Sequence, residues 1–182
     1  MNYIFETARL KLREFGLRDA SFIVGLMNSP GWLQFIGDRN IRNEEDAIAY
    51  LKSGPIKSYA DNGFGLWLVE CKDTGTAVGM CGILKRDNLA NPDIGFALLS
   101  EYAGRGYGRE VAEATLSYAF ETLELPAIAA ITKPDNHKSI KLLEAIGLKF
   151  QTRIAGSNQG EHLLLYHIQK FAGNQKLRPT LH

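Results

Sequence analysis

The sequence has little of what marks several specialised classes of protein. It contains only two cysteines in 182 residues, and its four histidines show no ligand spacing with one another or with cysteine. These shortages exclude a disulfide-rich secreted scaffold and argue against a structural zinc site, so we expect no metal. No apolar run approaches the ~18 residues of a membrane helix, and the charged N-terminal stretch lacks the apolar segment of a signal peptide. We therefore expect a cytoplasmic protein with no membrane partner.

Charge of one sign is lacking as well. The 21 Lys and Arg residues nearly balance the 20 Asp and Glu residues, which leaves a net charge of +1. The strong basic field of a nucleic-acid-binding protein is therefore absent, and we expect no nucleic-acid partner. A chain of this length forms one domain that buries roughly 70% of its unfolded surface without disulfides or metals. We place a single domain at residues 1–172 and a C-terminal tail at 173–182.

The hydrophobic periodicity predicts an order of strand, helix, helix, three strands, helix, strand, helix and two strands. Strands are expected at residues 9–15, 64–71, 76–85, 92–99, 127–132, 148–154 and 162–169, and helices at 20–28, 44–53, 109–123 and 139–146. Asp19 is expected to cap the first helix, and residues 29–41 to form a loop. The two cysteines, Cys71 and Cys81, are off register for a disulfide across their hairpin, so both are expected to be buried thiols.

The connections between these elements predict the fold class. The unit from residue 93 to residue 132 is a strand, a long helix and a strand, which predicts a right-handed parallel crossover. Hairpins make most of the other strand connections. We therefore predict an α+β fold with a mixed, mostly antiparallel central sheet of about seven strands and helices on both faces.

Three glycines lie between the strand ending near residue 99 and the helix that follows it. Gly104, Gly106 and Gly108 alternate with larger residues, and Arg105 and Arg109 lie among them. Free backbone N–H groups at the positive end of a helix dipole form an anion site, which a phosphate can approach closely where the residues are glycine. The alternative is a tight connection in which glycine supplies only a positive φ. Three glycines with two arginines favour the anion site.

Spacing excludes three common nucleotide-binding motifs. The sequence has no Gly-Lys-Ser/Thr, so it cannot form a Walker loop. The dinucleotide fingerprint fails because Arg109 occupies the position of its third glycine. The kinase glycine loop fails on the same spacing. The glycine loop therefore indicates an anion of another kind.

Residues 95–120, "GFALLSEYAGRGYGREVAEATLSYAF", resemble motif A of the GNAT superfamily of acyl-coenzyme A N-acyltransferases. That motif, [QR]-x-x-G-x-[GA], here begins with Ala103 in place of Gln or Arg. Residues 133–150, "KPDNHKSIKLLEAIGLKF", resemble the family's second signature, in which Asn136 precedes Ser139 by three positions. "TARLKLREF", "IGDR" and "LWLV" resemble the branch that contains the ribosomal-protein N-terminal (alanine) acetyltransferases. The resemblance spans residues 7 to about 170 and agrees with the predicted strand order.

The resemblance implies the GNAT fold, with acetyl-coenzyme A as the co-substrate. Amides of residues 105–109 would hold the pyrophosphate, and the backbone of Leu98 and Leu99 would pair with the pantetheine arm like an added strand. Asn136 would bond the pantetheine amides, although it also suits an ordinary helix N-cap. The implied cofactor-binding residues are Leu98, Leu99, Gly104, Arg105, Gly106, Tyr107, Gly108, Arg109, Asn136 and Ser139.

The chemistry requires a neutral amine to attack a thioester and a group to accept its proton. Ser139 would meet the departing thiolate, although a serine is also ordinary in a first helical turn. Asp93 opens the strand beside the cofactor and is our candidate base, although the position fits a structural acid at a strand start better. Competing bases are Glu161, His162, Tyr166 and water. A backbone N–H near Leu99 would stabilise the oxyanion.

The acceptor side is predicted from an aromatic loop. Trp32 and Phe35 would wall the acceptor pocket, or would instead pack the first helices onto the sheet. The expected function is acetyl transfer to a primary amine, first a protein or peptide N-terminus. The alternatives are a small-molecule amine such as a polyamine, amino acid or antibiotic, or a non-catalytic coenzyme A-binding regulatory module. Exposed edge strands also allow a homodimer.

Overall fold

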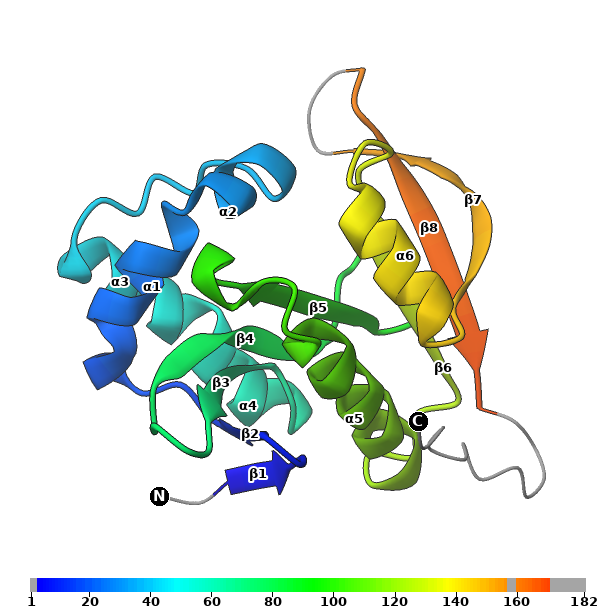
Figure 1. Ribbon diagram of the computed structural model, residues 1–182. Coiled ribbons are helices and arrows are strands. Elements are labelled where there is room, and N and C mark those ends of the chain that lie inside the picture. Colours follow the sequence, from blue (N-terminus) through cyan, green and yellow to red (C-terminus); the bar gives the residue numbers. More distant parts are fainter. Residues whose placement is uncertain (1–2, 157–159, 171–182) are drawn as a thin grey trace.

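A computed structural model describes residues 3–156 and 160–170 of the chain (Figure 1). The strands are β1 (Tyr3–Glu6), β2 (Leu10–Arg13), β3 (Leu66–Cys71), β4 (Ala77–Leu84), β5 (Asp93–Leu98), β6 (Ala127–Thr132), β7 (Lys149–Ala155) and β8 (His162–Gln169). The helices are α1 (Ala20–Met27), α2 (Pro30–Phe35), α3 (Glu44–Ser53), α4 (Pro55–Asn62), α5 (Tyr107–Glu121) and α6 (His137–Ala145). Short 3₁₀ turns lie at η1 (Leu17–Asp19) and η2 (Ser100–Tyr102).

Within these residues the strands form one eight-stranded sheet in the order β1-β2-β3-β4-β5-β6-β8-β7. Neighbouring strands are antiparallel except β5 and β6, which are parallel and joined through α5. The predicted α+β class and its single parallel crossover are confirmed. The eighth strand, β1, was not predicted, because four residues beside a charged turn carry too short a pattern to show a period.

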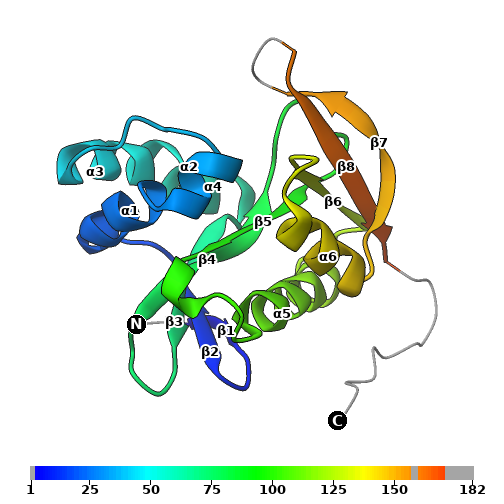
Figure 2. The same ribbon diagram turned by 45° about the horizontal axis from the view of Figure 1, so that its top comes forward.

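The two faces of the sheet are covered by different helices. Leu68 of β3 and Met80 of β4 are buried with residues of α1, α2 and α3. Their neighbours Trp67 and Cys81 point to the other face, where they are buried with residues of α5 and α6. Successive side chains of β3 and β4 therefore point to opposite faces of the sheet, and both faces are buried. Figures 1 and 2 show α1–α3 on one side of the sheet and α5 and α6 on the other, as predicted.

Two helices were missed. Residues 29–41 were predicted to form a loop, but Pro30 begins the six-residue helix α2, with Ser29 in an extended conformation before it. A proline fits the first position of a helix because that N–H has no partner there in any case. Pro55 begins α4 in the same way, and Gly63 ends it with φ of 73°. The Ser29-Pro30 pair therefore lies just after the end of α1 and also at the start of α2.

The predicted first-helix cap is only partly right. Asp19 does precede α1, but its carboxylate makes no hydrogen bond to that helix. It accepts instead from the Gly16 N–H (2.8 Å) and from the guanidinium of Arg13 (2.8 and 2.9 Å). Arg13 also donates to Glu70 (2.8 Å), so an ion network is buried beside η1.

The remaining predictions concern the two cysteines, the end of α6 and the C-terminal part of the chain. Trp67 is paired with Cys81 in the β3–β4 hairpin, and both cysteines are free and buried, as expected. Gly147 ends α6 with φ of 95°. The predicted tail at 173–182 and the domain limit at 172 lie outside the described residues, as does part of the predicted turn before β8. No helix in the described ranges has the length and apolar character needed to span a membrane.

Candidate functional site

The sheet opens between β5 and β6. These parallel strands share one paired position, Asp93 with Ala129, and the Ala129 N–H donates to the carbonyl of Pro92 (2.9 Å). Beyond that point they diverge: β5 stays with β4, and β6 stays with β8 (Figures 1 and 2). The five residues of β5 after Asp93 extend roughly 17 Å toward the glycine loop. One edge of β5 is thus left without a neighbouring strand along that length.

The open edge of β5 exposes Leu98 rather than Leu99. The Leu99 N–H donates to the carbonyl of Val78 (2.9 Å), and its carbonyl accepts from Tyr102 (3.0 Å). Because successive N–H groups of a strand point to opposite edges, the N–H of Leu98 points away from β4. Leu98 can therefore pair with an extended ligand, whereas the backbone of Leu99 is already occupied.

The glycine loop presents a row of unpaired amides. Among the hydrogen bonds of the described residues, none is donated by the backbone N–H groups of residues 104–109. The first bond of α5 is donated by Glu110 to the carbonyl of Gly106 (3.1 Å). These amides surround the N-terminus of a 15-residue helix, where the dipole favours negative charge. The loop has the donors and the potential of an anion site.

Two of the three glycines hold backbone conformations that other residues rarely adopt. Gly104 has φ of 76°, and Gly106, the N-cap of α5, has φ of 80°. Gly108 lies within the helix, where a Cβ would come 3.1 Å from Leu142 and 3.7 Å from Leu98. The first two glycines shape the loop, and the third allows α5 to pack closely on β5 and α6.

The two loop arginines differ in their partners. Arg109 donates to Glu113 (2.8 Å), one turn further along α5, with both side chains largely exposed. The guanidinium of Arg105 lies over the ring of Tyr102, 5.4 Å from its centroid. Arg105 is exposed and carries no acidic partner among the described contacts, so it is the freer of the two to meet an anion.

The second signature lies at the start of α6. Asn136 is the N-cap, and its Oδ1 accepts from the Ser139 N–H (3.1 Å). This is the ordinary capping role. The Asn136 Nδ2 group makes no hydrogen bond in the described part of the chain, so the side chain has both its donors free for a ligand, while Oδ1 already accepts one bond. Ser139 is half-buried in the first turn.

Asp93 lies where β5 and β6 part. It is only 1% exposed, and both carboxylate oxygens accept from Arg86 Nε at 3.0 Å. Burial raises the pKa of Asp93 above its ordinary value, and the charge of Arg86 partly offsets that rise. The position agrees with a proton acceptor at the closed end of the opening. The ion pair agrees equally with an anchor for the strands.

The competing bases are held in other ways. Glu161 lies 3.7 Å from Lys133 in an ion pair. His162 is exposed at the start of β8. The Tyr166 hydroxyl is buried and donates to Glu144 (3.4 Å). None of these three lies on β5.

The two aromatic residues predicted for the acceptor pocket have different environments. Trp32 is 6% exposed within the core beneath α1 and α3, and its Nε1 donates to the carbonyl of Gly37 (3.1 Å). Phe35 lines a hollow of about 310 Å³ that α2 shares with the segment before α6. The lining residues of this hollow are Gln34, Phe35, Asp135, Asn136, His137 and Lys138. The structure therefore brings Phe35 and Asn136 together.

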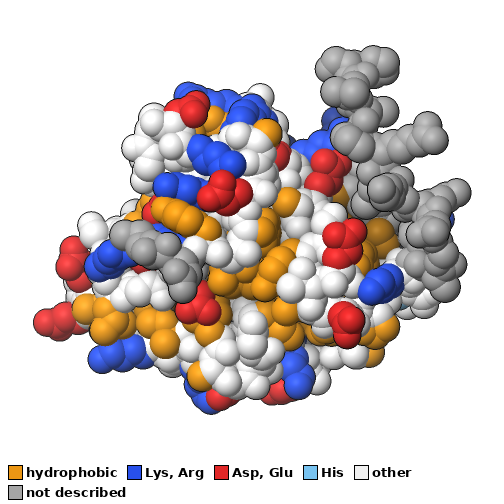
Figure 3. Space-filling model, turned by 90° about the horizontal axis from the view of Figure 1, so that it is seen from below, with side chains coloured by type: hydrophobic (Ala, Val, Ile, Leu, Met, Phe, Trp, Pro, Cys, Tyr) orange, Lys and Arg blue, Asp and Glu red, His pale blue; other side chains and the backbone are white. Residues whose placement is uncertain are grey.

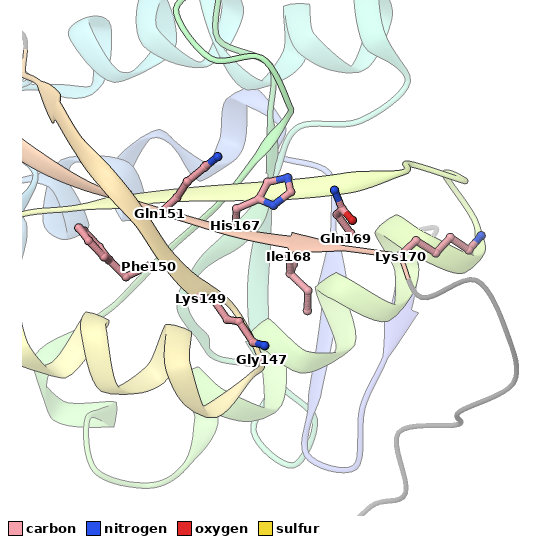
Figure 4. Close-up of a pocket in the computed structure, with 8 residues that line it drawn as sticks. All are labelled: Gly147, Lys149, Phe150, Gln151, His167, Ile168, Gln169 and Lys170. Atoms are coloured by element: carbon pink, nitrogen blue, oxygen red, sulfur yellow. The ribbon is translucent and has the colours of Figure 1, made fainter.

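A larger hollow of about 490 Å³ lies elsewhere. Its walls come from β7, β8 and the turn after α6, and Figure 4 shows Lys149 and Phe150 on one strand and His167 and Gln169 on the other. No predicted site residue lines it. The described residues contain no group of three or more metal-ligating side chains.

Sequence reasoning missed three charged residues at the site. Arg86 pairs with Asp93, and Arg9 and Glu110 pair beside the glycine loop. Arg9 and Glu110 are 101 residues apart, and neither shows a motif of its own. The signal in the sequence was the charge of Arg9 in the turn before β2. That charge alone does not indicate that Glu110 is its partner.

The chain matches known proteins over most of its length. A family model described as "Acetyltransferase (GNAT) domain" matches residues 9–149. The uncharacterized protein YkkB of Bacillus subtilis is 31% identical over 156 residues, 84% of this chain and 89% of the relative. The uncharacterized N-acetyltransferase YoaA of the same organism is 28% identical over 147 residues, 80% and 82% of the two chains.

Solved structures share the fold. An acetyltransferase from Agrobacterium tumefaciens superposes with a TM-score of 0.78 at 26% identity, over 93% of this chain and 95% of that one. A ribosomal-protein-S5-alanine acetyltransferase from Vibrio fischeri gives 0.77 at 21% identity, over 93% and 97%. A ribosomal L7/L12 α-N-protein acetyltransferase in complex with coenzyme A gives 0.77 at 14%, over 92% and 98%. The family model and the relative that is 31% identical each cover most of this chain. The chain therefore belongs to the GNAT acetyltransferase family.

Proposed function

We propose that this GNAT acetyltransferase transfers the acetyl group of acetyl-coenzyme A directly to a primary amine. One observation carries the assignment of the cofactor. The six amides of residues 104–109 lack acceptors at the start of α5, and they follow the open edge of β5 after the short turn η2. A pyrophosphate joined to an extended amide-bearing arm matches both features. The structural relative in complex with coenzyme A supports this choice.

Coenzyme A then lies along β5. The pyrophosphate accepts from the amides of residues 105–109, and the pantetheine arm pairs with the backbone of Leu98. Asn136 Nδ2 donates to a pantetheine carbonyl. Ala103 contributes no polar side chain, and none is required because the cradle consists of backbone donors. The thioester is directed toward the Asp93 end of the opening.

Acetyl transfer is a direct displacement. The amine nitrogen attacks the thioester carbonyl and forms a C–N bond, the C–S bond breaks, and the electron pair leaves with sulfur. The Ser139 hydroxyl keeps its proton and donates a hydrogen bond to the departing thiolate, which takes a proton from solvent. The amine loses one proton to Asp93 through a water, because Asp93 itself is almost fully buried. A carboxyl pKa raised by burial makes a better proton acceptor than an ordinary one.

The proposed acceptor is a protein or peptide N-terminus. The hollow at α2 combines the apolar ring of Phe35 with only one carboxylate, Asp135, against the positive charge of Lys138. Lys133 extends into the same region, where it donates to the carbonyl of Gln34 (3.2 Å) and pairs with Glu161 at 3.7 Å. A polyamine carries several positive charges and would need more carboxylates than these.

A cytoplasmic location forms part of the proposal. Both cysteines are free in the structure, as expected in a reducing compartment. The face seen in Figure 3 carries Lys and Arg interspersed with Asp and Glu, without an extended field of one sign. That face offers no basic patch for RNA, in agreement with the net charge of +1.

The direct test is an amine panel. The full chain is incubated with acetyl-coenzyme A and with peptides beginning in Ala or Ser, spermidine or free lysine, and thiol release and product mass are measured. We expect release with the peptides and acetylation at their α-amine. Acetylation of spermidine alone would assign a small-molecule acceptor. Tight coenzyme A binding with no release above hydrolysis would contradict catalysis and favour a regulatory module.

The role of Asp93 has its own test. Asp93→Asn should lower kcat by about 10²-fold or more and remove the acidic limb of the pH–rate profile. The control is Asp61→Asn, which removes a carboxylate paired with Lys57 on the surface of α4. An unchanged kcat in Asp93→Asn would limit this residue to anchoring Arg86.

A further inference from the structure

Arg9 holds the glycine loop from a distant part of the chain. Its Nη1 donates to the carbonyl of Arg105 (2.9 Å), and its Nε donates to Glu110 (2.6 Å). The face of the guanidinium lies over the ring of Tyr107, 4.6 Å from the centroid. The Arg9 backbone N–H (2.8 Å) and the Thr7 hydroxyl (2.6 Å) both donate to the other oxygen of Glu110. One side chain thus joins the loop and the first turn of α5.

The bond to Arg105 fixes the direction of an amide. Residues 105 and 106 share a trans peptide, in which the C=O and N–H groups point in opposite directions. Because the carbonyl of Arg105 points to Arg9, the N–H of Gly106 points to the other side. That N–H is one of the six without an acceptor in the described part of the chain. Arg9 therefore orients a donor without occupying it.

The bond to Glu110 removes a charge that would oppose an anion. A carboxylate in the first turn of α5 lies near the cradle proposed for the pyrophosphate. Arg9 pairs with it through two nitrogens, with Nη2 at 2.6 Å as well, and Glu110 keeps only 17% of its side chain exposed. The guanidinium meets Glu110 and the Arg105 carbonyl through three separate nitrogens, whereas an ammonium carries all its donors on one nitrogen.

We propose that Arg9 is a positioning residue for the pyrophosphate cradle. It sets the direction of the Gly106 amide and neutralises Glu110, and it does so from the β1–β2 turn without belonging to the glycine motif. The inference rests on the proposed function, because it assumes that the loop binds the coenzyme A pyrophosphate. It adds a residue outside both signatures to the cofactor site.

The test compares acetyl-coenzyme A with acetylpantetheine, which carries the same thioester but no pyrophosphate. Arg9→Gln should weaken binding of acetyl-coenzyme A by about tenfold to a hundredfold, as expected for loss of a charge-assisted contact. The KM for acetylpantetheine should stay unchanged, because that substrate does not use the cradle. Arg9→Lys should lose most of the same affinity, since it keeps the charge but not the planar fork.

One variant serves as the control, and two results would overturn the inference. Lys57→Met removes an exposed cation that is paired on α4 and should leave both substrates unaffected. Equal losses for acetyl-coenzyme A and acetylpantetheine would show a merely structural role and overturn the inference. Full affinity in Arg9→Lys would reduce Arg9 to a charge and overturn positioning. If the parent protein itself failed to bind acetyl-coenzyme A, the proposed function would fail first.

Discussion

Two arginines four positions apart pair with carboxylates in opposite ways. Arg13 lies between Asp19 and Glu70, and none of the three side chains is more than 9% exposed. Arg9 pairs with Glu110 at the surface, with 48% of its side chain exposed. The first network lies beneath the helices that begin at η1, and the second lies beside the glycine loop.

The difference lies in what each network leaves unpaired. No buried side-chain nitrogen or oxygen among the described residues lacks a partner, so the network of Arg13 is closed on itself. Arg9 uses its donors on one side of the loop and leaves the amides of residues 104–109 open on the other. A closed network stabilises the fold, and an open one prepares a site. Stability and cofactor binding should therefore respond to different residues.

The largest effect is expected on stability, from Arg13→Leu. This change leaves Asp19 buried without its guanidinium partner and Glu70 with Lys11 alone, at 3.7 Å, which costs about 3–5 kcal/mol of unfolding free energy. Urea denaturation followed by circular dichroism measures the loss. At a temperature where the variant is still folded, its affinity for acetyl-coenzyme A should equal that of the parent. A large loss of affinity there would break the separation of the two networks.

The reverse pattern is expected from Gly106→Val. A β-branched residue is strained at φ of 80°, and its Cβ would lie 3.2 Å from Arg9 Nη2. Strain and a displaced amide together should weaken acetyl-coenzyme A binding by about a hundredfold, as measured by calorimetry. The thermal midpoint should fall little, because the loop is exposed. Unchanged binding would place the phosphate cradle elsewhere.

Sequence patterns predicted the parts of the fold whose signal is local. The apolar runs of β3, β4 and β6, and the 3.6-residue period of α5, each extend over six residues or more. The missed elements are short or begin at a proline: β1 has four residues, and the helices α2 and α4, with six and eight, begin at Pro30 and Pro55. In such elements a single proline or charge outweighs the period, so Pro30 indicated a break where it begins a helix.

The candidate site divides in the same way. The glycine loop and the cap at Asn136 were predicted because their chemistry lies in consecutive residues. Arg9 and Arg86 were not, because each acts through a partner that only the folded sheet brings near. Pairing with β4 also decides that Leu98 rather than Leu99 has a free backbone N–H group. The spacing of residues in the sequence does not reveal this pairing.

A smaller effect is expected from Asp19→Asn, and it should depend on pH. Burial alone would raise the pKa of Asp19, but hydrogen bonds from Arg13 and the Gly16 N–H lower it overall. A lowered carboxyl pKa contributes stability above the unfolded value of about 3.9, and that contribution is lost as the pH falls through the folded pKa. The variant should lose about 1.5–3 kcal/mol near pH 7.

The pH dependence provides the check for Asp19. Urea denaturation at several pH values should show the difference between variant and parent narrowing below about pH 4. Asp61→Asn, which removes an exposed ion pair with Lys57, should cost no more than about 1 kcal/mol at any pH. A gap for Asp19→Asn that stayed constant from pH 7 to pH 2 would show that its ionisation contributes nothing to the buried network.

The smallest effect separates conformational strain from contact within the loop itself. Gly104 and Gly106 have nearly the same φ, 76° and 80°, but a Cβ on Gly104 would meet no atom within 4 Å, whereas one on Gly106 would meet Arg9. Gly104→Ala should therefore cost only the strain of a left-handed residue, about 1–2 kcal/mol. Part of that strain is relieved when the empty loop rearranges, so acetyl-coenzyme A binding should weaken by no more than about tenfold. Gly106→Ala carries the same strain plus the displacement of Arg9, and calorimetry should find it the weaker binder of the two. Equal affinities would mean that Arg9 does not position the loop, and that both networks serve the fold alone.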